Sequence, residues 1–321
     1  MSDERWSTIA FSLGIPTRPG KRSDHETNKL AQRMSKRKVV SSSQTFDLIA
    51  SLIHKLASVH PQLSQENRCV YHNDAVPTLD SLKNTVHRLP TPKPAISVGY
   101  FRDNFQLSHD ELQNGIITGP AGEPCDLNHI SQPVPEHFWP FFVVEISDKS
   151  MAAARDASAV TAATCNHGLA LLSEAAREEK GWSDTTFLRD NRHSKTFSLS
   201  VHGKAASLSV HGADASVGEL ASVIGTYMLD NPDSVATLAD RIQSIFVWGR
   251  FSRLPSIMSS LDELDRKVHG EFSGVTVLDS SYDFDPHCLK GLVLEAPRRP
   301  DRLKVVLKAG LPSLPSWLKP T

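Results

Sequence analysis

One hexapeptide constrains the fold of this chain more than any other segment. Phe141-Phe142-Val143-Val144-Glu145-Ile146 is the most apolar strand in the sequence, and a run of this kind predicts a strand that is buried in a sheet. An alanine-rich segment follows it, from Ser150 to about Glu179, with Ser150 in the N-cap position of a helix. Its small side chains suit close packing, so the two segments predict a long helix lying on a sheet.

The remaining elements complete an α/β pattern. Apolar residues recur at helical spacing from Phe46 to Val59 and predict the first core helix. A proline-rich stretch keeps the chain extended before a second apolar strand, Ala95 to Phe101. Residues 198–203 and 207–212 repeat Ser-Leu-Ser-Val-His-Gly, which predicts an added β-hairpin. C-terminal helices are predicted near 216–230, 232–247 and 256–268. The predicted fold class is therefore α/β, a mixed β-sheet flanked by helices.

The charge is distributed unevenly along the 321 residues, although the formal net charge is only −1. Residues 1–40 carry nine Lys and Arg against four Asp and Glu, and residues 290–321 carry seven against two. The middle of the chain holds 19 basic residues against 30 acidic ones. We therefore expect a flexible basic arm (1–44), a folded domain (45–289) and a basic, proline-rich tail (290–321).

The arm carries two basic clusters, which together resemble a bipartite nuclear-import signal: Lys21, Arg22, Lys36, Arg37 and Lys38. A solvated tail with no partner explains the same clusters equally well. Because the body of the chain is acidic and phosphate binding depends on positive charge, DNA or RNA would first contact the basic ends. An acidic protein is the alternative partner.

Several classes of protein are excluded or disfavoured by the sequence. No run approaches the roughly 18 to 20 apolar residues of a membrane span, and the N-terminus has acidic residues where a secretory signal has basic ones. The four cysteines lie far apart and form neither a zinc pair nor a disulfide framework: Cys69, Cys125, Cys165 and Cys288. We expect a nuclear or cytoplasmic protein that is not secreted and has no membrane partner.

Two features of the sequence contain residues that could bind a metal ion or take part in catalysis: a glutamate within the apolar strand and a repeated histidine. Glu145 interrupts the most apolar strand, where an unpaired buried carboxylate is costly. Strand alternation either turns it toward solvent or places it in a site at the end of the strand, and the pattern leaves both open. His202 and His211 occupy equivalent positions in the twin hexapeptides. They could face each other across the hairpin and hold a metal ion, although histidines exposed at strand ends are more common.

Segments along the chain carry a resemblance to a known family. They are Pro92 to Tyr100, Pro140 to Glu145, the helix through Thr164-Cys165-Asn166, Thr196 to Val201, and Ile245 to Arg250 followed by Arg253-Leu254. In this order they resemble a large uncharacterised fungal family with a PD-(D/E)XK (restriction-endonuclease-like) nuclease core. The resemblance covers roughly residues 45–268. It implies a restriction-endonuclease-like mixed sheet.

The resemblance also implies which residues would form a nuclease site. In active relatives the first strand begins Pro-Lys-Pro-Asp and the next carries Glu-x-Lys. The Asp and Glu, at adjacent strand ends, bind Mg²⁺, which activates a water molecule, and the Lys orients that water. In this sequence Ala95 replaces the Asp and Ser147 replaces the Lys, while Glu145 is retained as a possible metal ligand. A glutamine often found in the following helix corresponds to Asp156.

The degenerate motif predicts a nuclease-like protein without catalytic power that serves as a binding or regulatory module, with no expected cofactor. The alternative is an active Mg²⁺- or Mn²⁺-dependent nuclease whose site is rebuilt around Glu145. Asp148, Lys149 and Asp156 are then the migrated catalytic partners. A third possibility is an interaction module that works through its basic ends alone, with the core as a scaffold.

Overall fold

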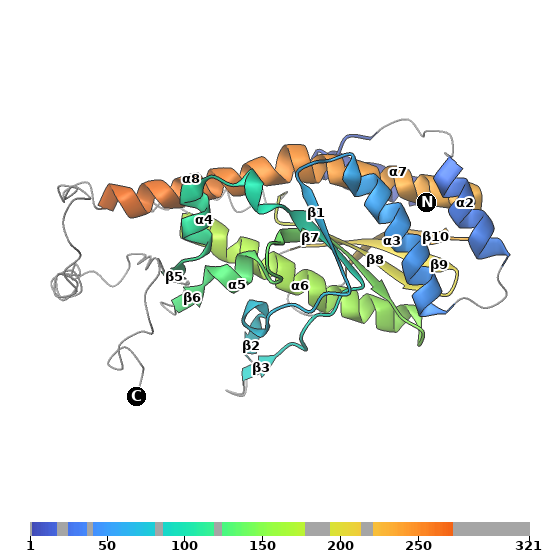
Figure 1. The fold of residues 1–321 in the computed structure, drawn as a ribbon, viewed down its shortest axis with the longest axis horizontal. Helices are drawn as coiled ribbons and strands as arrows, with labels where there is room; N and C mark the ends of the chain where they lie inside the picture. Colours follow the sequence, from blue (N-terminus) through green and yellow to red (C-terminus); the bar gives the residue numbers. More distant parts are fainter. Residues whose placement is uncertain are drawn as a thin grey trace.

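In the computed structural model, a six-stranded mixed sheet forms the centre of the protein (Figure 1). The structure describes residues 2–17, 25–36, 41–80, 86–118, 124–176, 193–212 and 221–271. In sheet order the strands are β1 (Leu63–Asn67), β4 (Ile96–Tyr100), β7 (Phe138–Ile146), β8 (Thr196–His202), β9 (Ala205–His211) and β10 (Ser222–Met228). Within this sheet β7 and β8 pair in parallel, and the other neighbours pair antiparallel. A parallel pair needs a crossover connection, and the segment between them contains α6 (Met151–Ala176).

All but one of the helices expected from the sequence are present around this sheet. The first core helix is α3 (Ser42–Ser58), whose N-cap Ser41 accepts a hydrogen bond from the Gln44 amide. The Ser150 hydroxyl accepts a hydrogen bond of 3.0 Å from the Ala153 amide and so caps α6. At the C-terminal side, α7 (Pro232–Trp248) continues through the π-helical turn η4 (Gly249–Arg253) into α8 (Leu254–Glu271). The predicted α/β class, with a mixed sheet, a hairpin and C-terminal helices, is confirmed.

The two faces of the sheet differ in character. One face is apolar: Phe142 of β7 packs edge-on against Phe246 of α7, with 5.3 Å between the ring centroids. The other face lies under α6 and carries buried hydroxyl groups, for example Ser200, whose Oγ lies 2.8 Å from the Ser158 Oγ of α6. Because side chains alternate along a strand, the repeated Ser-Leu-Ser-Val sequence sends its leucine and valine to one face and its serines to the other.

The hairpin between β8 and β9 is confirmed, but one neighbouring prediction is wrong. Gly203 has a φ of +58°, which suits glycine in the two-residue turn between His202 and Ala205. The helix predicted near 216–230 is instead the strand β10 over its described part, paired antiparallel with β9. Valine, isoleucine, threonine and tyrosine dominate β10, and these residues favour strands once a neighbouring edge is available.

Smaller elements fill the connections. Two short hairpins form, β2 (Thr78–Asp80) with β3 (Val86–Arg88) and β5 (Ile116–Thr118) with β6 (Pro124–Asp126). Four short helices lie in the same parts of the chain: η1 (Asn73–Ala75), η2 (Arg102–Asn104), α4 (Leu107–Gln113) and α5 (Leu127–Ser131). No helix of the described ranges is long and apolar enough to cross a membrane.

The first 44 residues differ from the expected flexible arm. They contain α1 (Ser2–Leu13) and α2 (His25–Ser35), which contact β10 and α7 respectively. Their inward side chains are buried in the main core: Trp6, Ala10, Leu13, Ile15, Leu30, Ala31 and Met34. The polar composition concealed these helices, because each places only a narrow apolar stripe on the body.

The proposed nuclear-import residues are only partly described. Lys36 directly follows α2 and is exposed. Lys21, Arg22, Arg37 and Lys38 lie outside the described residues, as does the whole basic tail, 290–321. The import function therefore stays a prediction.

Replacing Trp6 tests the packing of α1. The Trp6 side chain is 9% exposed, and the Arg241 guanidinium lies 5.6 Å from its ring centroid. We expect Trp6→Ala to lower the free energy of unfolding by about 2 kcal/mol, less than for a ring at the centre of the core. Phe11→Ala, on the same helix but 89% exposed, is the matched control and should change it by less than about 0.5 kcal/mol. Urea denaturation measures both, and equal stability of the two variants would contradict a packed α1.

Candidate functional site

Glu145 lies near the end of β7, and its side chain points toward α6 rather than into solvent. The Thr161 hydroxyl of α6 donates a hydrogen bond of 2.8 Å to its Oε1 atom, and the residue is 7% exposed. Burial raises the pKa of Glu145 to about 7, although the hydrogen bond from Thr161 lowers it. Of the two orientations that the sequence left open, the structure has the inward one, and near neutral pH the carboxyl group is about half protonated.

Ala95 and Ser147 lie close to Glu145 along the backbones of β4 and β7. The Ala95 amide donates a hydrogen bond of 2.9 Å to the Val144 carbonyl, beside the peptide that precedes Glu145. Ser147 extends β7, because its amide donates to the Val201 carbonyl of β8 at 3.0 Å. The structure thus brings the three positions together where β4 begins and β7 ends, and Glu145 alone among them has a carboxylate.

The three candidate partner residues point elsewhere. Both carboxylate oxygens of Asp148 accept hydrogen bonds from Ser42, from its amide at 3.0 Å and its hydroxyl at 2.8 Å. Ser42 begins α3, which packs on the apolar side of the sheet, away from α6. Lys149 is exposed. Asp156 is also exposed, on the side of α6 that faces away from the sheet. Among the described residues, Glu145 belongs to no group of three or more side chains that could ligate a metal ion.

The twin histidines neither face each other as a metal-binding pair nor lie exposed at the strand ends, the more common arrangement, since His202 is half-buried and His211 is buried. In the hairpin His202 lies opposite Ala205 and His211 lies opposite Thr196, which places the two rings at opposite ends. Each histidine is the fifth residue of its hexapeptide, but the two copies run in opposite directions in the hairpin. Equivalent positions of the repeat therefore lie at opposite ends of it. His202 Nδ1 donates to the Ser147 carbonyl at 2.8 Å. His211 bonds to Ser198 Oγ at 2.8 Å, and burial lowers its pKa to about 4.

A buried polar chain crosses β1, β4 and the start of β7, and no sequence motif indicated it. Tyr71 Oη lies 2.7 Å from Ser97 Oγ, Ser97 Oγ lies 2.8 Å from His137 Nε2, and His137 Nδ1 lies 2.7 Å from Ser64 Oγ. Burial lowers the pKa of His137 to about 3, so its imidazole is neutral. Since all four residues are buried, these hydrogen bonds join the strands within the core.

Two free cysteines, Cys69 and Cys165, lie near Glu145. Cys165 Sγ of α6 is 3.7 Å from Tyr71 Oη. Burial is the main cause that raises the pKa of both Cys69 and Cys165 to about 12, and the Glu145 carboxylate contributes in the same direction. Both pKa values favour the protonated thiol at neutral pH, whereas a nucleophilic cysteine reacts as the thiolate.

A separate cluster of chemically active side chains lies on the surface. His72 precedes η1, Asp74 belongs to η1, and His129 belongs to α5; the side chains of the three form one group of potential metal ligands. All three line a groove of about 910 Å³. No sequence motif indicates this cluster, because its members come from segments more than 50 residues apart and have no recognisable spacing.

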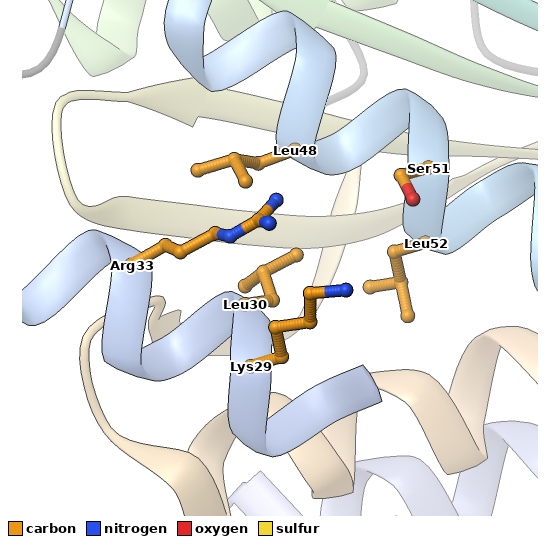
Figure 2. A pocket seen from close by; sticks show the side chains of 6 residues that line it. All are labelled: Lys29, Leu30, Arg33, Leu48, Ser51 and Leu52. Carbon is orange, nitrogen blue, oxygen red and sulfur yellow. The ribbon is translucent and has the colours of Figure 1, made fainter. Parts of the chain in front are cut away.

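A second cavity, between α2 and α3, is too small for a ligand (Figure 2). Its volume is about 20 Å³, room for about one water molecule. Six side chains line it: Lys29, Leu30, Arg33, Leu48, Ser51 and Leu52. The cavity therefore marks the packing of α2 on α3 rather than a binding site.

Comparisons with known proteins give a family and no function. Among curated proteins no significant match to the chain was found. None was found among solved structures. The family described as "Domain of unknown function (DUF7924)" matches residues 26–261, which include α3, all six strands of the main sheet, α7 and the first turns of α8. This chain therefore belongs to the DUF7924 family.

Proposed function

We propose that this chain is a nuclease-like protein of the PD-(D/E)XK type that has lost catalysis and acts as a binding or regulatory module. One observation carries the proposal: Glu145, the retained motif acid, is buried under α6 and has an alanine where the second metal ligand would be. The adjacent ends of β4 and β7 support the family resemblance, since these are the strands that hold the motif.

The surroundings of Glu145 disfavour a bound Mg²⁺ or Mn²⁺ ion. Such ions prefer several oxygen ligands, commonly including carboxylates. Ala95 supplies a methyl group, and Asp148 is engaged by Ser42. Burial also favours the protonated form of Glu145, which is a poor ligand.

The position that carries lysine in the nuclease motif has no positively charged side chain in this sequence. Ser147 is there, and its hydroxyl accepts a hydrogen bond of 3.1 Å from the Lys149 amide. A serine has no positive charge with which to orient a nucleophilic water or offset charge in a transition state. The absence of both the second acid and the lysine argues against phosphodiester hydrolysis at this place.

The partner proposed for this module is DNA or RNA, contacted through the basic ends of the chain. Three basic residues of the described part lie on or next to α2: Lys29, Arg33 and Lys36. Together with the basic residues around them in sequence, they would attract phosphate groups. The alternative partner is an acidic protein, which would bind the same basic residues and compete with nucleic acid.

Metal binding and cleavage test the proposal in one set of variants. We expect the natural protein and Glu145→Ala to give the same calorimetric titration with Mg²⁺ or Mn²⁺. Gel shifts should show nucleic-acid binding without any added metal ion. The double variant Ala95→Asp with Ser147→Lys restores the motif and should gain Mg²⁺ binding that Glu145→Ala then removes. Metal-dependent cleavage by the natural sequence that is lost in Glu145→Ala would instead establish an active, rearranged nuclease.

A further inference from the structure

We propose that His72, Asp74 and His129 bind a divalent transition-metal ion such as Zn²⁺ at the surface groove between η1 and α5. This site is separate from Glu145 and does not depend on the proposed function. It combines two imidazoles and one carboxylate, all within one cluster of side chains whose ligand atoms lie within 4.8 Å of one another.

The distances are close to those of a metal site. His72 Nδ1 lies 3.6 Å from Asp74 Oδ2. In a tetrahedral zinc site with bonds of about 2.0 to 2.2 Å, neighbouring ligand atoms are separated by roughly 3.3 Å. The rings of His72 and His129 stack with 3.6 Å between their centroids and an interplanar angle of 13°. The in-plane lone pairs of two stacked rings lie in nearly parallel planes, so one imidazole must rotate out of the stack before both nitrogens reach the same ion. Both side chains line the groove, into which a ring can turn.

The backbone holds the three ligands in place from two sides. The His72 amide donates a hydrogen bond of 2.8 Å to the Pro133 carbonyl, which ties the start of η1 to the chain just after α5. Next to the ligands, Tyr71 and Ala75 are buried on one segment and Ile130 on the other. These contacts fix the backbone of both segments, so only the ligand side chains need to reorient when the ion binds.

The donor set selects the class of metal. Two imidazole nitrogens and a carboxylate oxygen suit Zn²⁺ and other first-row transition ions, whereas Mg²⁺ and Ca²⁺ prefer oxygen ligands alone. Three protein ligands leave one position of a tetrahedral ion open to the groove. That groove is also lined by polar side chains, among them Lys93, Asn128 and Gln132.

Titration of the full-length, metal-free protein with Zn²⁺ tests the site. We expect calorimetry to show one Zn²⁺ per chain bound at this site, and binding at least about tenfold weaker in His72→Ala, His129→Ala and Asp74→Asn. Co²⁺ should give the visible absorption of a tetrahedral ion in the natural protein and lose it in the same variants. His54→Ala removes an exposed histidine from α3 and is the matched control, which should bind normally.

Two results separate this inference from its alternatives. Identical Zn²⁺ titrations of the natural protein and of the His72→Ala, His129→Ala double variant, with both folded by circular dichroism, would overturn the site. Zn²⁺ binding that survives Glu145→Ala is expected, because the two places share no residue. Binding that is lost in Glu145→Ala and kept in the histidine variants would move the ion to the other site and refute this inference.

Discussion

Arg253→Met should lower the free energy of unfolding by about 3 to 5 kcal/mol, the largest effect we expect from any single substitution described here. Arg253 lies in η4 and is fully buried. Its Nη1 atom donates to the Trp139 carbonyl at 2.8 Å and to Tyr100 Oη at 3.3 Å, and its Nη2 atom donates to the Pro140 carbonyl at 3.3 Å. Methionine fills the space but leaves these buried acceptors without that donor.

The acceptors are available because β7 departs from regular pairing at this place. The register between β4 and β7 shifts between Val98 and Tyr100, and Trp139 has a positive φ of 47°. Carbonyl groups in such an irregular segment need a donor from outside the sheet. The guanidinium also lies over two aromatic rings, 5.6 Å from the Tyr100 centroid and 5.2 Å from the Phe141 centroid, which adds a cation–π contribution.

Arg250→Met is the matched control, since Arg250 lies in the same helical turn but is only half-buried and packs over the exposed ring of Phe251. We expect a loss of less than about 1 kcal/mol there. Arg253→Lys should also be destabilising, because one ammonium group cannot reach the three acceptors in the same geometry. Denaturation curves measure all three variants. If Arg253→Met is as stable as the natural protein, the free-energy cost of burying the guanidinium charge equals the stabilisation from its hydrogen bonds, and the prediction is wrong.

Glu145→Gln should make the protein more stable above neutral pH, by on the order of 3 kcal/mol at full effect. The folded structure raises the pKa of this carboxyl group from 4.5 to about 7 by burial. The protonated group therefore contributes stability that is fully present below pH 4.5 and is lost as the pH rises through 7. Glutamine is neutral at every pH and accepts the same hydrogen bond from Thr161, so it removes the loss.

The difference between the two proteins carries the test. Unfolding free energies measured at several pH values should coincide near pH 4.5 and diverge steadily up to about pH 8. Glu111→Gln, an exposed carboxylate on α4, is the control and should follow the natural protein throughout. Parallel curves for Glu145→Gln and the natural protein would mean that Glu145 is solvated in solution. A rise in the stability of the natural protein at pH 8 on adding millimolar Mn²⁺, absent in Glu145→Gln, would contradict the proposed loss of the metal site.

Local pattern was sufficient where a segment had one dominant periodicity. The sequence predicts the strand around Phe142, the helix capped by Ser150 and the hairpin of the repeated hexapeptide, because each signal is contained within a few residues. The α1 and α2 helices were not predicted, since a short apolar stripe such as Leu30 with Met34 acquires meaning only when a partner surface is present. The strand β10 was mistaken for a helix for the same reason: its pairing partner β9 supplies the preference.

The candidate sites depended still more on the tertiary structure. The sequence identified Glu145 as an unusual carboxylate within an apolar strand, because side-chain identity is local information. Whether that carboxylate faced solvent or α6 could not be read from alternation alone. The orientation is decided by packing, which places Thr161 against it and raises its pKa.

The sequence by itself determined the α/β class, the central strands β4, β7, β8 and β9, the helices α3, α6, α7 and α8, and the residue types at positions 95, 145 and 147. Only the tertiary structure decided that Asp148 serves the start of α3, that His202 and His211 lie at opposite ends of the hairpin, and that His72 and His129 stack. The physical reason is the separation along the chain over which each interaction acts. Periodicity and residue type act within a helix turn or a strand, whereas these contacts join residues that are separated along the chain and meet only when the sheet has formed.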